Sequence, residues 1–166
     1  IALELLARGT KVYAGARNPE FIDLPGAIPL QLDITDPQSV MAAAEVASDV
    51  TLLINNAGSA TGASLLTGEL NDIHLEFNTH VFGTLSMIRA FAPVIEKNGG
   101  GSILNILSAL SWLSLGNSGA YSAAKSAQWG ITNALRLELA PKNVSVAALH
   151  VAFMDTDMTV GIDAPK

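Results

Sequence analysis

The stretch from Ser102 to Lys125, SILNILSALSWLSLGNSGAYSAAK, decides the fold. Its first six residues form a largely apolar run, which is typical of a strand buried in a parallel sheet. After a loop, a helix is expected from Gly119, and it places Tyr121 and Lys125 on one face, one turn apart. Ser108 follows the strand directly, so its hydroxyl can face the phenol and the ammonium across the mouth of an α/β sheet.

Outward from this stretch, short apolar runs alternate with helical patterns along the chain. Strands are expected at 11–16, 27–32, 50–54, 102–107 and 144–150, and helices at 1–8, 37–48, 70–97 and 119–140. Thr35 or Asp36 is expected to cap the second helix, with Pro37 in its first turn. The alternation predicts a parallel, doubly wound α/β sheet with helices on both faces. Because no repeat or linker interrupts it, residues 1–166 are expected to form a single domain.

The composition narrows the functions that the chain can have. Its 166 residues are 49% hydrophobic and 14% charged, which predicts many buried strands or surface hidden in an oligomer. The net charge of -6 argues against nucleic acid or an acidic membrane surface as a partner. Cysteine is absent and the three histidines are scattered, so we expect no disulfide and no metal site. No apolar run is long enough to span a membrane, and we expect a cytoplasmic protein.

A second motif follows the strand expected at 50–54. It reads Asn55-Asn56-Ala57-Gly58, and alone it indicates a polar turn with a glycine at positive φ. Ligands of doubly wound sheets bind beyond the carboxyl ends of the strands, where this turn falls.

Taken together, the motifs resemble those of the short-chain dehydrogenase/reductase family over nearly the whole chain. The residues that carry this resemblance, besides the turn at 55–58, are Asn78, Ser108, Tyr121 and Lys125. The resemblance implies a Rossmann-like fold and transfer of a hydride between a nicotinamide cofactor and a carbonyl or secondary alcohol. A tyrosine and a lysine at this spacing could also be mere surface neighbours.

The resemblance assigns a role to each of these side chains. Tyr121 would be the general acid/base, but a free phenol has a pKa near ~10, too high for efficient work at neutral pH. Lys125 and the positive nicotinamide of the oxidised cofactor would favour the phenolate. Ser108 would hydrogen-bond the carbonyl oxygen. Asn78 would hold a water that relays protons to the lysine, which Gly83 supports; alternatively, it is an asparagine tolerated inside a long helix.

The cofactor preference is predicted from the end of the strand at 11–16. Relatives that prefer NAD carry an acidic residue there for the ribose 2′-hydroxyl, whereas this chain has Ala16 and then Arg17. An arginine suits a 2′-phosphate, so we expect NADP, although a solvated arginine would look the same. The remaining cofactor residues implied by the resemblance are Asp33 and Ile34 at the adenine, Asn55, Ala57 and Gly58 at the adenosine ribose, and Tyr121 and Lys125 at the nicotinamide ribose.

The segment from Val151 to Thr156 follows the last expected strand. In relatives a Pro-Gly pair and a threonine meet the carboxamide here; this chain keeps Thr156 and offers the backbone of Phe153 and Met154. Without Pro and Gly the loop conformation is in doubt, because Ala152 resists positive φ.

The glycine-rich turn that holds the pyrophosphate in the family is not present in this sequence. The chain begins without methionine, inside the helix that would follow that turn. The first strand, which lies centrally between those at 11–16 and 50–54, is therefore missing from the chain as given. We expect an incomplete domain that binds dinucleotide weakly by itself.

The loop after Ser108 is apolar and would form the wall of the substrate pocket. Its candidate pocket residues are Ala109, Trp112 and Leu113, which favour a small, uncharged, moderately hydrophobic ketone or secondary alcohol; packing explains Trp112 and Leu113 almost as well. The helices at 70–97 and 119–140 match the interface helices of related homodimers and homotetramers. The alternatives to an enzyme are a non-catalytic dinucleotide-sensing module and an oligomerisation fragment of the same fold.

Overall fold

The computed structural model describes residues 1–152. The helices are α1 (Ala2–Ala7), α2 (Pro37–Val46), α3 (Leu70–Phe77), α4 (Thr84–Lys97) and α5 (Gly119–Leu139). The strands are β1 (Tyr13–Ala16), β2 (Ile28–Gln31), β3 (Leu52–Asn55), β4 (Gly101–Ser108) and β5 (Val144–Val151). Each expected strand and helix is present. The helix expected at 70–97 is continuous but contains a π-helical turn, Asn78–Gly83, between α3 and α4.

The strands form two parallel sheets, β1–β2 and β3–β4–β5. In the larger sheet Asn55 of β3 is opposite Asn105 of β4, and Ser108 of β4 is opposite Val151 of β5. Because the pairing is parallel, these strands end at one edge of the sheet. Among the strands of residues 1–152, neither β1 nor β2 pairs with β3, so the two sheets are separate.

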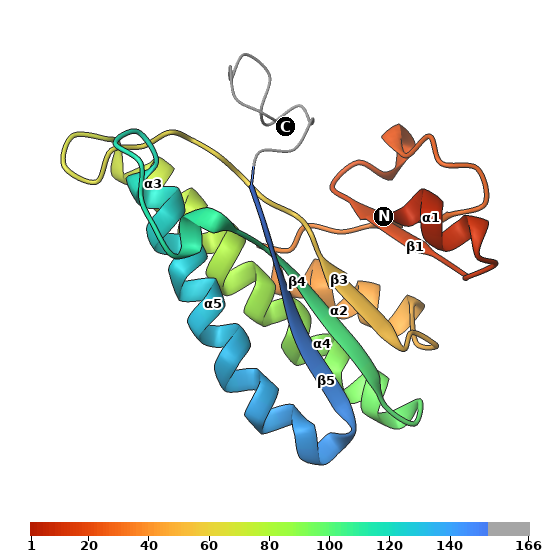
Figure 1. The fold of residues 1–166 in the computed structure, drawn as a ribbon. Helices are drawn as coiled ribbons and strands as arrows, with labels where there is room; N and C mark the ends of the chain where they lie inside the picture. Colours follow the sequence, from red (N-terminus) through yellow and green to blue (C-terminus); the bar gives the residue numbers. More distant parts are fainter. Residues whose placement is uncertain (153–166) are drawn as a thin grey trace.

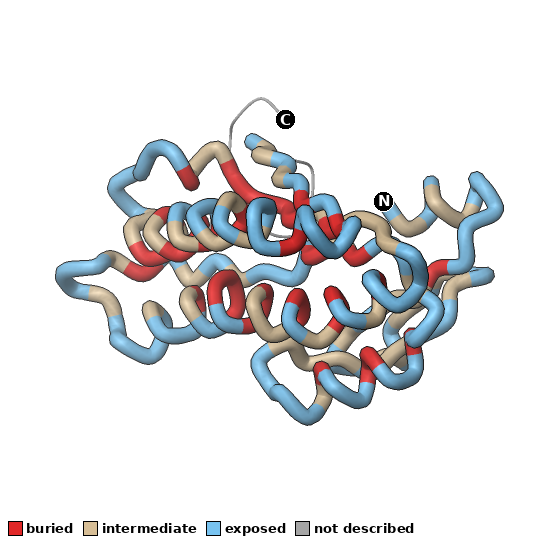
Figure 2. Tube along the Cα trace, turned by 90° about the horizontal axis from the view of Figure 1, so that it is seen from below, coloured by how far each residue is buried: buried red, intermediate tan, exposed pale blue. Residues whose placement is uncertain are grey.

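Three helices cover one face of the larger sheet. Figure 1 shows α2, α4 and α5 together on that face, with α1 beside the smaller sheet. The core between them is apolar and is built from α2, α4 and the inward residues of the strands; its most buried members include Val40, Ile88, Ile95, Ile103 and Val144. Figure 2, viewed from below, shows that the buried residues recur along the inner sides of the helices. The Rossmann-like α/β class is thus confirmed.

Burial alternates along β3 and β5. Leu53 and Val146 face the helices and are buried, whereas Leu52 and Leu149 point to the opposite side and are 40% and 47% exposed. The difference arises because the described helices pack on one face of this sheet. None of the helices within residues 1–152 combines the length and the apolar character needed to cross a lipid bilayer.

Local chemistry explains where two elements start and how closely they pack. Asp36 caps α2 by accepting a hydrogen bond from the Gln38 amide at 2.9 Å, and Pro37 occupies the first turn, as predicted. Gly83 ends the π-helical turn against Ile34. A Cβ at this position would lie 2.9 Å from Ile34 Cδ1, so a larger residue would require the Ile34 side chain to move.

Candidate active site

The structure brings together Ser108, Tyr121 and Lys125 at the carboxyl end of β4. Ser108 is the last residue of β4, and its Oγ is held by the amide of Leu110 at 3.1 Å. Tyr121 lies in the first turn of α5, and Lys125 follows one turn later. Lys125 Nζ is 5.7 Å from the centroid of the Tyr121 ring. A hydroxyl, a phenol and an ammonium therefore share one small volume, as their spacing predicts.

The environment of Tyr121 favours the protonated phenol. Burial raises the pKa of Tyr121, a hydrogen bond with Ser108 opposes the rise, and the negative charge of Glu76 adds to it. Desolvation penalises the charged phenolate more than its polar neighbours stabilise it. The expectation that Lys125 and the oxidised nicotinamide favour the phenolate concerns the site with cofactor bound and stays a prediction.

Lys125 is held by a buried network that crosses three elements. Its Nζ is 2.9 Å from the carbonyl oxygen of Ile106 in β4 and 3.1 Å from Oε1 of Gln128. Gln128 in turn donates to Thr84 of α4 at 2.9 Å. Burial lowers the pKa of Lys125 to about 8, although the charge of Glu76 acts in the opposite direction. Sequence reasoning missed Gln128, whose spacing of three residues from Lys125 on a helix was the available signal.

The side chain of Asn78 is exposed at the start of the π-helical turn, so its expected role of holding a water that relays protons to Lys125 stays a prediction. His80 is fully buried, and its ring meets the Tyr121 ring edge-on with centroids 5.2 Å apart. His80 therefore packs directly beside Tyr121.

His80 is paired with Glu76, one turn earlier in α3. Nε2 of His80 lies 3.2 Å from Oε2 of Glu76, and both side chains are fully buried. Glu76 also accepts hydrogen bonds from Ser59 Oγ at 2.8 Å and from the Thr61 amide at 2.5 Å. Burial raises the pKa of Glu76, but hydrogen bonds from His80, Thr61 and Ser59 outweigh this effect and hold the pKa at about 2. Sequence reasoning missed the pair, although its spacing of four residues on a helix was visible.

The loop after β3 contributes backbone rather than side chains to the expected cofactor site. The Asn55 side chain is buried and donates to Asn105 Oδ1 at 2.8 Å, and Asn105 donates to Thr132 of α5 at 2.9 Å. The amide of Asn55 therefore ties β3 to β4 and α5. Ala57 and Gly58 are exposed beyond the strand end, where their backbone is accessible.

Arg17 and Asp33 lie near one another at the carboxyl ends of β1 and β2. Hydrogen bonds from the side chain and backbone of Thr35 lower the pKa of Asp33, and the charge of Arg17 contributes. The Arg17 side chain is exposed and Asp33 is half-buried, while Ile34 packs against the π-helical turn at Gly83. The Asp33 carboxylate is thus hydrogen-bonded to Thr35, and the Arg17 guanidinium is exposed at the end of β1.

Comparison with known proteins identifies the family. The family model for short chain dehydrogenase matches residues 1–166. The chain belongs to the short-chain dehydrogenase family. A short-chain dehydrogenase of Burkholderia cenocepacia J2315 solved with NADP is 40% identical, with a TM-score of 0.94 over 98% of this chain and 70% of that one. A 3-ketoacyl-(acyl-carrier-protein) reductase of Brucella melitensis solved with NADH is 27% identical, with a TM-score of 0.88 over 95% of this chain and 71% of that one.

Among curated short-chain dehydrogenases and reductases, the NADPH-dependent 1-acyldihydroxyacetone phosphate reductase of Schizosaccharomyces pombe is 30% identical over 164 residues. The match takes in 94% of this chain and 55% of that protein. An uncharacterized oxidoreductase of Bacillus subtilis, YusZ, is also 30% identical, with 90% of this chain and 59% of that protein covered. The chain therefore spans between half and two thirds of the length of these curated relatives.

The loop that leads from Ser108 to α5 carries the expected substrate residues of this short-chain dehydrogenase. Ala109 begins a short turn and is half-buried, and Leu113 is 52% exposed. The Trp112 ring stacks on the His150 ring at 4.0 Å between centroids and meets Trp129 edge-on at 5.8 Å. Trp112 is thus partly used in packing, which was the alternative considered for it.

The last cofactor residues expected of the family lie at the carboxyl end of the chain. Val151 ends β5 opposite Ser108, one of the three residues of the cluster. Phe153, Met154 and Thr156 lie outside the described residues. Within residues 1–152 no three acidic or histidine side chains gather in a way that would hold a metal ion.

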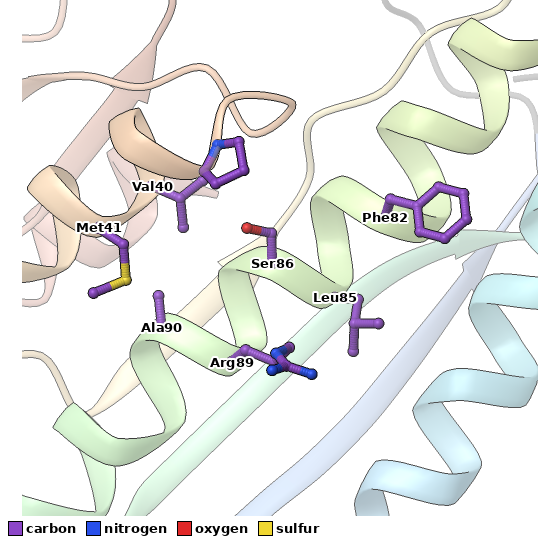
Figure 3. Close-up of a pocket in the computed structure, with 8 residues that line it drawn as sticks. Val40, Met41, Phe82, Leu85, Ser86, Arg89 and Ala90 are labelled. Carbon is purple, nitrogen blue, oxygen red and sulfur yellow. The ribbon is translucent and has the colours of Figure 1, made fainter.

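A separate groove of about 410 Å³ lies between α2 and α4. Figure 3 shows Val40 and Met41 of α2 facing Ser86 and Ala90 of α4 across it. Phe82, Leu85, Arg89 and Pro37 complete the lining. None of these residues belongs to the cluster around Tyr121, so we assign the groove no catalytic role.

Proposed function

We propose that the protein is an oxidoreductase that transfers a hydride between NADP(H) and a carbonyl compound or secondary alcohol. The observation that carries the proposal is the convergence of Ser108, Tyr121 and a buried Lys125 at the carboxyl end of β4. In a doubly wound sheet, this edge is where ligands bind. Membership of a family of dehydrogenases supports the same reaction class.

Each side chain in the cluster has a chemical task in this reaction. Tyr121 donates its phenolic proton to the carbonyl oxygen in reduction and accepts a proton from the alcohol in oxidation. Ser108 donates a hydrogen bond to the same substrate oxygen and stabilises the charge that develops there. Lys125 has a third N–H beyond those engaged by Ile106 and Gln128, and this hydrogen is available to the phenolate or to a ribose hydroxyl.

The residues at the strand ends fit the adenosine half of NADP. Arg17 provides an exposed positive charge for the 2′-phosphate, and no acidic residue replaces Ala16 beside it. The backbone at Ala57 and Gly58, the Ile34 side chain and the Asp33 carboxylate supply the adenine and ribose contacts. When bound, the cofactor supplies or accepts the hydride. The NADP-bound relative from Burkholderia cenocepacia supports this preference, although a less similar relative was solved with NADH.

The substrate side is apolar and faces the same end of the sheet. Trp112 and Leu113 are exposed on the loop that follows Ser108, and no charged residue interrupts Ser108 to Lys125. This composition favours an uncharged, moderately hydrophobic ketone or secondary alcohol. Exposed apolar residues on the long helices, among them Phe82 and Leu137, support a homodimer or homotetramer assembled through α3–α4 and α5.

The full-length protein tests the proposal directly. We would incubate it with NADPH deuterated at nicotinamide C4 and a panel of uncharged ketones, and analyse the alcohol products by mass spectrometry. Deuterium on the carbinol carbon, with NADPH used in preference to NADH, is the expected result. Saturable NADPH binding without product from any ketone would instead support a dinucleotide sensor, and no binding at all would support an oligomerisation fragment.

A further inference from the structure

Glu76 and His80 are buried ionisable groups that the proposed reaction does not use. Both are fully buried, and Glu76 has a pKa of about 2 through its hydrogen bonds. Their contacts join three parts of the chain, since Glu76 binds Ser59 and Thr61 in the loop after β3 and His80 contacts Tyr121 in α5. A carboxylate this deep within a protein is costly unless it is fully hydrogen-bonded. Glu76 meets this condition through Ser59, Thr61 and His80, and the resulting pair lies next to Tyr121.

The surroundings of His80 fix which ring nitrogen carries hydrogen. Nε2 lies 3.0 Å from the carbonyl oxygen of Ser59 and 3.2 Å from the carboxylate of Glu76. The Ser59 amide is farther away, at 3.3 Å. Two acceptors, one of them fully charged, outweigh one distant donor, so Nε2–H is the favoured arrangement.

With Nε2 engaged, the other ring nitrogen is left without a partner. Nδ1 of His80 is buried, and no side chain or backbone group within residues 1–152 hydrogen-bonds it. The ring is thus oriented from one side only, by Glu76 and Ser59. Its remaining contact is the edge-on packing with the Tyr121 ring at 5.2 Å. Glu76 holds the His80 ring in one orientation, and the His80 ring in turn restricts the orientation of the Tyr121 ring by packing against it.

The charge of Glu76 also acts on both reacting groups of the cluster. The ionisable groups that face Tyr121 are Lys125 on its own helix, His80 on the π-helical turn and Glu76 on α3. The negative charge of Glu76 raises the pKa of Tyr121 and opposes the fall in the pKa of Lys125. Both groups therefore retain their protons more firmly than they would beside a neutral residue.

We propose that Glu76 and His80 form a positioning pair that orients the Tyr121 ring and keeps the phenol protonated, so that it can donate its proton in carbonyl reduction up to a higher pH. In that direction the Tyr121 O–H bond breaks and a new O–H bond forms on the substrate oxygen. NADPH, when bound, would supply the hydride for the carbonyl carbon and would be oxidised as the carbonyl is reduced. The resulting phenolate recovers a proton through Lys125. This inference rests on the proposed function, and it adds two positioning residues to the proposed site.

The first test measures the ionisation of Tyr121 in the full-length protein without cofactor. Tyrosinate absorbance is followed against pH, and the curve of a Tyr121→Phe variant is subtracted to isolate Tyr121. Glu76→Gln removes the charge with little change in shape, and we expect it to move the Tyr121 midpoint to lower pH. Glu96→Gln is the matched control, since Glu96 is on α4, is 43% exposed and pairs with Lys142. Equal midpoints in wild type and Glu76→Gln would overturn the proposal.

The second test needs no variant of Glu76 and therefore holds even if Glu76→Gln does not fold. In ¹⁵N-labelled wild type, with the His80 signals assigned by their loss in His80→Phe, NMR reports which ring nitrogen is protonated. We expect hydrogen on Nε2, and a ring with hydrogen on Nδ1 alone would contradict the pair.

Kinetic measurements provide a third test, and they distinguish a failure of the Glu76–His80 pair from a failure of the proposed function. In Glu76→Gln the alkaline limb of kcat for reduction should move to lower pH, with KM for the ketone little changed. A purely structural role for Glu76 would lower kcat at every pH without moving the limb, and that result would overturn the proposal. If wild type reduces no ketone, the proposed function fails, while the two measurements on Tyr121 and His80 still decide whether the pair exists.

Discussion

The β3–β5 half of the molecule and the unit formed by residues 1–32 differ in how many of their residues are buried. In the β3–β5 half, apolar residues such as Ile95 and Ile103 are fully buried, and the polar residues near Tyr121 are hydrogen-bonded across several elements. In the unit 1–32, α1 has no buried residue, β1 and β2 have none either, and Val12 is its one buried residue.

This difference separates the two tasks of the site. The proposed acid/base residues belong to the well-packed half, whereas Arg17, the residue expected to select NADP, follows a strand of the unit 1–32. We infer that the geometry around Tyr121 depends on a core that is sensitive to substitution, and that binding of the adenosine end can be changed at little cost in stability. Four predictions test this comparison, all for the full-length protein.

The largest effect on stability is expected from the same substitution made in each half. Ile103→Ala removes a fully buried side chain from β4 and should lower the free energy of unfolding by about 3–4 kcal/mol. Ile28→Ala in β2, where the residue is 38% exposed, should cost less than about 1 kcal/mol. Denaturant unfolding of both variants measures the difference, and equal losses would break the comparison.

A pH-dependent effect is expected from Lys125. Its pKa is lowered by burial from 10.5 to about 8, so the unfolded chain binds more protons between these pH values and stability rises with pH across that window. Relative to Lys125→Met, wild type should therefore gain about 3 kcal/mol between pH 7 and pH 11. Unfolding curves at the two pH values provide the test, and a constant difference would refute it.

Lys11 in the unit 1–32 is the matched control for this prediction. A hydrogen bond with Asp49 is the main reason that the pKa of Lys11 is raised above 10.5. Its contribution is therefore present below pH 10.5 and lost as pH rises through the folded pKa, the opposite sign to Lys125. Lys11→Met should show no gain for wild type on going to pH 11.

The smallest expected effect concerns the choice of cofactor. Arg17→Ala removes the charge proposed to face the 2′-phosphate and should weaken NADPH binding about tenfold, while NADH binding is unchanged. Arg8→Ala makes the same charge change in the unit 1–32, where Arg8 pairs with Glu4, and should affect neither cofactor. Calorimetric titration of both cofactors distinguishes these outcomes; an equal loss for NADPH and NADH would contradict a 2′-phosphate contact.

The parts of the fold that could be predicted are those determined by local sequence. The strand pattern before Ser108, the cap at Asp36 and the spacing of Tyr121 and Lys125 each involve neighbours in the chain, and the structure has all of them. The one-sided burial of β3 and β5 could not be predicted, because it depends on which helices pack against the sheet.

The π-helical turn and the pairing of Glu76 with His80 could not be predicted, for physical reasons. A π-helical turn contains more residues than an α-helical one, so an α-helical reading of 70–97 misplaces the side chains that follow its start. Glu76 and His80 acquire their role from Ser59 and Thr61 in a distant loop. No spacing within the helix reveals those partners.

The central claim is that Tyr121 supplies the proton in hydride transfer, and Tyr121→Phe tests it most directly. We would measure steady-state reduction of the best ketone substrate together with the dissociation constant for NADPH. The account predicts that kcat falls about 10²–10⁴-fold, the usual contribution of a general acid, while NADPH binding is retained. A variant that keeps the wild-type kcat, or that loses activity only in proportion to lost NADPH binding, would contradict it.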